Sequence, residues 1–257
     1  MNLAAIDLAI LGPAFAAGLL VTATHAPLGI QVLGRGIVFI DLAIAQVAGL
    51  GVILADSLGL EPQGWAVQVA ALVAAFAGAL LLTWTEKHWP EVQEAVIGTV
   101  FILAASGALL LLAANPHGGE HLKELLVGQI LWVSWSRLLP VAVAYALLLA
   151  LLFGFGERLR RIGFYLVFAI AVTVSVQLVG LYLVFTTLIV PALATHRLRR
   201  GRLAACYALG AAGYGAGLLA SAVFDLPSGA VIVWALALFA LPVFAWGTRS
   251  VRGGMPG

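Results

Sequence analysis

The sequence predicts an all-α protein, a polytopic integral membrane bundle of about eight or nine transmembrane helices. Of its 257 residues, 63% are hydrophobic and only 9% are charged, and the mean hydropathy is +1.11. So few charges cannot cover a water-soluble protein of this size, whereas runs of about 20 apolar residues match the thickness of a bilayer. The runs are continuous rather than alternating, which favours helices over barrel strands. We expect residues 1–257 to form a single transmembrane domain.

Five apolar runs, each long enough for one crossing, occupy the first part of the chain. After the second run, Asp56, Ser57, Gly59 and Pro62 predict a turn, because these residue types favour turns. The third run has a tryptophan at each end, as is typical of spans that end at membrane interfaces. The predicted spans are Leu3–Thr24, Ile37–Ala55, Trp65–Trp84, Ala95–Ala114 and Leu138–Phe155.

The next apolar run, Phe164–Thr195, has 32 residues and is too long for one crossing. Gln177 and Gly180 lie near its middle, so we expect two short or broken helices that are joined there, with Pro191 tolerated where neighbouring helices satisfy its backbone. Two last spans are predicted at Leu203–Phe224 and Ala230–Trp246.

Small residues within these spans predict close helix packing. Gly213 and Gly217 form a GxxxG motif. We favour packing within one bundle over dimerisation for this motif.

Basic residues predict the orientation, because cytoplasmic loops are enriched in Lys and Arg. With the N-terminus outside, all but Lys123 and Arg137 of the 13 basic residues fall on the cytoplasmic side. We therefore expect an outside N-terminus and a cytoplasmic C-terminus. The net charge of +2 is segregated by side and gives no indication of nucleic-acid binding.

Asp41 and Gln46 are polar residues inside the second span. A charged side chain at membrane depth costs about 2.5 to 3.5 kcal/mol, so it usually faces a bundle interior or a polar pathway. Their five-residue spacing places the two side chains about 140° apart around a helix, so they share at most a broad cavity wall. A carboxylate supplies the hard oxygen that a divalent cation prefers, and Gln supplies a neutral carbonyl oxygen. Asp41 is therefore either a metal ligand on a transport path or a hydrogen-bonding bridge between helices.

His117, Glu120 and His121 match the HxxEH pattern of inverted zinc proteases. Asn-Pro precedes the motif and Gly-Gly interrupts it, so we expect a loop rather than the helix that this chemistry needs. The loop is a candidate outward metal contact or an ordinary solvated loop.

The sequence holds no GxxxxGK[ST] motif, because neither Lys87 nor Lys123 follows a glycine. We therefore predict that the chain is not an enzyme and that any ATP hydrolysis occurs on a partner subunit.

Several segments together resemble the membrane permease family of zinc and manganese ABC transporters. They are PLGIQVLGRGIVFIDLAIAQVAGLGV at 27–52, EAVIGTVFILAASGALLLL at 94–112, LKELLVGQILWVSW at 122–135, VGLYLVFTTLIVPALAT at 179–195 and FDLPSGAVIV at 224–233. The resemblance spans most of the chain. It implies a permease subunit of an importer for a divalent metal ion such as zinc, manganese or iron, located in a bacterial inner membrane.

The resemblance also implies partners and site residues. It implies a homodimer surrounded by membrane lipid, a cytoplasmic ATPase subunit and an extracytoplasmic metal-binding protein, with no cofactor held by this chain and the metal ion as substrate. By position, Asp41 matches a family Asp that faces the ion path, and Gln46 stands where the family usually has His. The family's cytoplasmic segment after the fifth span is longer than the segment here, GFGERLRRIG. Its residues Glu157, Arg158, Arg160 and Arg161 are candidates for the ATPase contact or for a positive-inside anchor.

Two other functions are compatible with the same residues. In an ion-coupled secondary transporter or channel, Asp41 is a cation or proton relay and the broken helix pair near Gly180 forms the midplane site. In a non-transporting membrane scaffold, Asp41 has no transport role.

Overall fold

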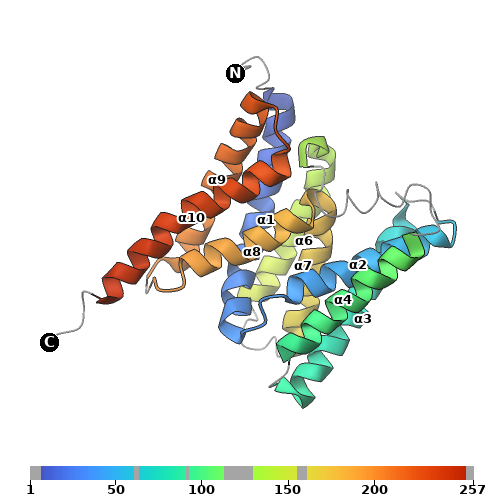
Figure 1. Cartoon of the computed structure of the whole chain (residues 1–257). Coiled ribbons are helices and arrows are strands. Elements are labelled where there is room, and N and C mark those ends of the chain that lie inside the picture. The colour runs from blue at the N-terminus through green and yellow to red at the C-terminus, as the bar shows by residue number, and fades with distance from the viewer. Residues whose placement is uncertain are drawn as a thin grey trace. The chain divides into compact units, whose positions relative to one another are not determined.

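A computed structural model describes residues 7–60, 64–90, 93–112, 130–154, 161–198 and 200–252, and within these ranges all regular secondary structure is helical (Figure 1). This confirms the predicted all-α fold. The elements are α1 (Leu8–Arg35), α2 (Ile40–Ser57), α3 (Trp65–His88), α4 (Gln93–Leu112), the 3₁₀ helix η3 (Ile130–Trp132), α6 (Trp135–Gly154), α7 (Arg161–Val179), α8 (Leu181–Ala194), α9 (Arg202–Phe224) and α10 (Ser228–Arg252).

Six of these helices are long and apolar enough to cross a membrane: α1, α2, α3, α6, α9 and α10. The other apolar segments in the described part of the chain are shorter and lie in α4, α7 and α8. Together they correspond one by one to the apolar runs of the sequence. The predicted multi-pass membrane bundle is thus confirmed.

The chain forms two compact units, each of which is described by itself. The first comprises residues 1–35, 127–145 and 178–257, and the second comprises residues 36–126 and 146–177. In the first unit, α1, α8, α9 and α10 pack against one another. In the second unit, α2 packs against both α3 and α4, and the three lie side by side (Figure 1).

The first helix is longer than the sequence predicted. The apolar run was expected to end at Thr24, but α1 continues through Pro27 to Arg35. A proline inside a helix cannot donate a hydrogen bond to the carbonyl four residues earlier. Here that carbonyl, at Ala23, accepts a hydrogen bond of 3.3 Å from the hydroxyl of Tyr207 on α9. The tertiary contact replaces the lost helical bond and lets the helix continue.

The predicted break in the run Phe164–Thr195 is confirmed. Gly180 separates α7 from α8 and has φ 87° and ψ 160°, a backbone conformation that is essentially restricted to glycine. At about 1.5 Å per residue, the 14 residues of α8 extend about 21 Å, which is less than the hydrocarbon core of a bilayer.

Small residues bring the helices of the first unit into backbone contact. A Cβ on Gly29 of α1 would overlap the carbonyl oxygen of Leu188 on α8. Gly213 and Gly217 of α9 face Leu236 and Ile232 of α10 in the same way. The GxxxG motif therefore packs helices within the bundle, as the sequence predicted.

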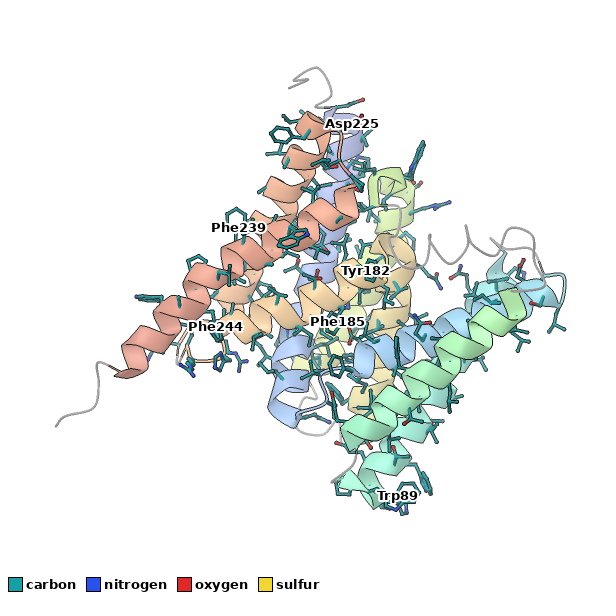
Figure 2. All side chains as sticks on the ribbon, viewed as in Figure 1. Trp89, Tyr182, Phe185, Asp225, Phe239 and Phe244 are labelled. Atoms are coloured by element: carbon teal, nitrogen blue, oxygen red, sulfur yellow. The ribbon has the colours of Figure 1, made fainter. Side chains whose placement is uncertain are left out.

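Large apolar side chains cover the outer faces of the helices. Trp65 is 80% exposed at the start of α3, and Trp84 is 48% exposed in its last turns. Figure 2 shows Phe239 and Phe244 on α10, where Trp234 is 70% exposed. Soluble proteins rarely expose so much apolar surface, whereas these faces fit contact with lipid.

The contact between α1 and α8 provides a stability test. We expect Gly29→Ala to lower the Tm of the detergent-solubilised chain, because overpacking costs about 1 to 3 kcal/mol. The matched control is Gly34→Ala on the same helix, where an added Cβ meets nothing within 4 Å and Ala improves helix propensity by up to about 1 kcal/mol. Equal Tm values for the two variants, measured by thermal unfolding, would contradict the contact.

Candidate functional site

Asp41 lies in the first turn of α2 and is completely buried. Neither carboxylate oxygen has a hydrogen-bond partner among the described residues. The idealised cost of moving a carboxylate-sized ion into a low-dielectric interior is of order 20 kcal/mol, and several kcal/mol remain after relaxation. A buried carboxylate without hydrogen bonds therefore needs a neutralising partner, either a proton or a cation.

The start of α2 explains why a carboxylate is tolerated here. Helix N-termini carry unpaired backbone N–H groups and a partial positive charge, which favour anions. Asp41 lies in this first turn, but neither of its carboxylate oxygens accepts a hydrogen bond from a described residue. The helix terminus offsets only a part of the burial cost.

A second carboxylate, that of Glu94, lies near the start of α2. Glu94 is in the first turn of α4, and its Oε1 accepts a hydrogen bond of 3.3 Å from the backbone N–H of Phe39, the residue that precedes α2. Its Oε2 is buried and has no partner among the described residues. Phe39 lies two residues before Asp41, so this hydrogen bond places Glu94 beside the start of α2. The structure thus brings Asp41 and Glu94 together in the second unit.

Glu94 was not among the predicted site residues. It ends a polar stretch between the third and fourth predicted spans. The order of the predicted spans could have identified Glu94. Alternate spans of a helical membrane protein run in the same direction, so the second and fourth spans begin at the same face. Acidic residues in the first turns of both spans are therefore expected to lie at one level.

Gln46 is half-buried on α2, one turn and a half beyond Asp41. It makes no hydrogen bond with the Asp41 carboxylate, since neither oxygen of that group has a partner. This agrees with the helical spacing, which directs the two side chains to different sides of α2.

The other predicted site residues are not tested. His117, Glu120 and His121, together with Glu157, Arg158 and Arg160, lie outside the described residues. Arg161 begins α7, but its side chain is also outside the described set. Among the residues that the structure does describe, no group of three or more His, Cys, Asp or Glu side chains could hold a metal ion. The pair formed by Asp41 and Glu94 falls below that number.

His25 is a buried titratable side chain of the first unit. Its Nδ1 lies 3.0 Å from the carbonyl oxygen of Val21 on the same helix and 3.0 Å from the hydroxyl of Thr24. The local hydrogen bonds fix the orientation of the ring, which leaves Nε2 as the only ring nitrogen without a partner.

A family model covers almost the whole chain. The model of the ABC 3 transport family matches residues 7–164 and 153–247. The chain belongs to the ABC 3 transport family. This membership agrees with the resemblance on which the sequence analysis based its prediction, and it establishes the chain as a membrane permease of an ABC transporter family.

Two curated proteins are similar to this permease over most of their length. One is the high-affinity zinc uptake system membrane protein ZnuB of Haemophilus influenzae, with 22% identity over 91% of this chain and 97% of the relative. The other is an uncharacterised membrane protein of Synechocystis, with 28% identity over 86% of this chain and 84% of the relative.

Two solved structures have the same fold as this permease. PsaBC from Streptococcus pneumoniae in complex with Fab superposes with a TM-score of 0.73 at 20% identity, over 91% of this chain and 90% of that chain. An inward-facing putative metal-chelate type ABC transporter gives a TM-score of 0.63 at 17% identity, over 93% of this chain and 85% of that chain.

The burial of Asp41 predicts a stability change in the metal-free permease. We expect Asp41→Asn to raise its Tm at neutral pH by at least about 3 °C, because Asn is neutral before and after folding, whereas Asp41 must either take up a proton or bury a charge when the metal-free chain folds. Thermal unfolding in the presence of a chelator measures the effect.

The control is Asp225→Asn, which makes the same chemical change at an exposed position with φ 53°. Asn tolerates this left-handed conformation as well as Asp does, so its Tm should not change. A lower Tm for Asp41→Asn than for the control would show that the carboxylate stabilises the metal-free fold.

Proposed function

We propose that this permease conducts a divalent metal ion in an ABC importer and that Asp41 lies on the path of the ion. The observation that carries the proposal is the fully buried Asp41 carboxylate, which has no hydrogen-bond partner among the described residues. Ionisable groups inside membrane segments usually mark pathways for ions or substrates. A divalent cation supplies the positive charge that this carboxylate lacks.

The chemistry of the second span bears on the choice of ion. Carboxylate and carbonyl oxygens are hard ligands that suit Mg²⁺, Ca²⁺ and Mn²⁺, whereas imidazole suits zinc and copper. The resemblance places a His where this chain has Gln46. We therefore favour manganese over zinc as the ion that this permease transports, although its relative in Haemophilus influenzae is named as a zinc uptake protein.

Partners follow from membership of an ABC transport family. ABC transporters hydrolyse ATP on their own nucleotide-binding subunits, and the sequence of this permease has no phosphate-binding loop. We propose a homodimer of permease chains in a bacterial inner membrane, with a cytoplasmic ATPase and an extracytoplasmic metal-binding protein. The N-terminus lies outside and the C-terminus in the cytoplasm in this arrangement.

Uptake by reconstituted vesicles tests the function. We expect vesicles that contain the permease with its ATPase to accumulate Mn²⁺ only when ATP is supplied, and Asp41→Asn to lower this uptake at least about tenfold because the ion loses its charged ligand. Asp225→Asn should transport at the wild-type rate.

Uptake that needs an ion gradient and no ATPase would replace this proposal with a secondary transporter. A mild-detergent pull-down from native membranes provides an independent check. It should recover an ATPase that carries phosphate-binding motifs together with the permease.

A further inference from the structure

We propose that Glu94 is a second carboxylate ligand for the transported cation and forms, with Asp41, a two-carboxylate site at the N-terminal ends of α2 and α4. This inference rests on the proposed function and assigns a further residue to it. The site belongs entirely to the second unit, in which α2 and α4 pack against each other.

Hydrogen bonding fixes the position of Glu94. Its Oε1 is held by the backbone N–H of Phe39 at 3.3 Å, two residues before Asp41. The preceding residue, Gln93, is buried and bonds to α3, with its Nε2 3.0 Å from the carbonyl oxygen of Leu82 and its Oε1 3.0 Å from the hydroxyl of Thr85. The start of α4 is thereby tied to both neighbouring helices. Glu94 itself is partly exposed, but its Oε2 is buried.

The remaining oxygens of the two side chains are unused. Oδ1 and Oδ2 of Asp41 and Oε2 of Glu94 are all buried, and none has a hydrogen-bond partner among the described residues. Asp41 is also completely inaccessible to solvent. Buried polar atoms in native structures nearly always have partners, and unpartnered ones call for an explanation such as an ion or a functional role. Three such oxygens on two adjacent carboxylates point to one shared ligand.

Charge balance decides the class of that ligand. Asp41 is fully buried and Glu94 is partly buried beside the start of α2. Among the described residues, none forms a hydrogen bond with Oδ1 or Oδ2 of Asp41 or with Oε2 of Glu94. Like charges on two neighbouring carboxylates disfavour each other. A divalent cation neutralises both charges at once, while a monovalent cation leaves one charge uncompensated. The oxygens are hard donors, which suit Mn²⁺, Mg²⁺ and Ca²⁺. The hydrogen bond from Phe39 leaves Glu94 one free oxygen, so it binds through Oε2.

A structural role for Glu94 is the alternative, since its bond to Phe39 joins α4 to the start of α2. Glu94→Gln separates the two roles. The amide oxygen of Gln still accepts the hydrogen bond from Phe39, but its side chain is neutral and supplies no carboxylate to the cation. If Glu94 acts only as an anchor, this variant binds cations as the wild type does.

The test measures Mn²⁺ binding to the full-length permease in nanodiscs by electron paramagnetic resonance, with Tm recorded for every variant. We expect one Mn²⁺ per wild-type chain, a loss of affinity of at least about tenfold for Asp41→Asn and for Glu94→Gln, and unchanged affinity for Asp56→Asn. Asp56 is the control because it lies at the opposite end of α2. Wild-type affinity in Glu94→Gln overturns the inference and leaves the proposed role of Asp41 intact.

A second measurement keeps the inference testable if Glu94→Gln does not fold. Infrared difference spectra of the wild-type chain with one equivalent of Mn²⁺ should show shifted stretching bands for two carboxylates, and a shift of a single carboxylate overturns the inference. Absence of Mn²⁺ binding to the wild type also overturns it. ATP-driven uptake in vesicles then judges the proposed function separately.

Discussion

Burial of the Asp41 carboxylate at the start of α2 sets a constraint that the neighbouring helices have to meet. The group is buried and accepts no hydrogen bond from the described residues, so packing and the terminus of its own helix must hold it in place. Gln93 and Glu94 contribute the polar contacts. Gln93 bonds to α3 and Glu94 to the backbone before α2, so two consecutive residues join three helices at one level. The arrangement fixes where the charges lie without neutralising them.

Several polar groups elsewhere in the described structure do have hydrogen-bond partners. Pro27 leaves the carbonyl of Ala23 without its helical partner, and Tyr207 supplies a replacement. Thr187 and Tyr214, both buried, share a hydrogen bond of 2.9 Å between α8 and α9. Arg202 has an unpaired Nε, but another nitrogen of its guanidinium donates to the carbonyl of Ala192. Asp41 differs from these groups because neither oxygen of its carboxylate has a partner among the described residues, and we therefore prefer a functional explanation.

Most of the fold could be predicted from the sequence, because bilayer thickness and backbone hydrogen bonding dictate helices wherever apolar runs are long enough. The break between α7 and α8 could also be predicted, because it lies at Gly180, whose backbone conformation is essentially restricted to glycine. The end of α1 could not be predicted, since its passage through Pro27 depends on Tyr207, which is distant in the sequence. Only one residue of the proposed site could be predicted. Asp41 is conspicuous inside an apolar run, whereas Glu94 looked like an ordinary flanking residue until α2 and α4 were placed side by side.

The proposed site of Asp41 and Glu94 has a consequence for how the permease would respond to an ion. An occupied site of one divalent cation and two carboxylates is neutral, so its burial costs far less than the burial of either charge alone. The empty site must instead either take up a proton or bury two like charges, and both cost free energy. Binding of the cation would therefore change the free energy of the contact between the N-terminal ends of α2 and α4. A ligand that binds one arrangement of helices more tightly than another shifts the equilibrium between them by that difference. In the proposed site, the free-energy cost of the empty state therefore couples binding of the ion to the arrangement of the surrounding helices.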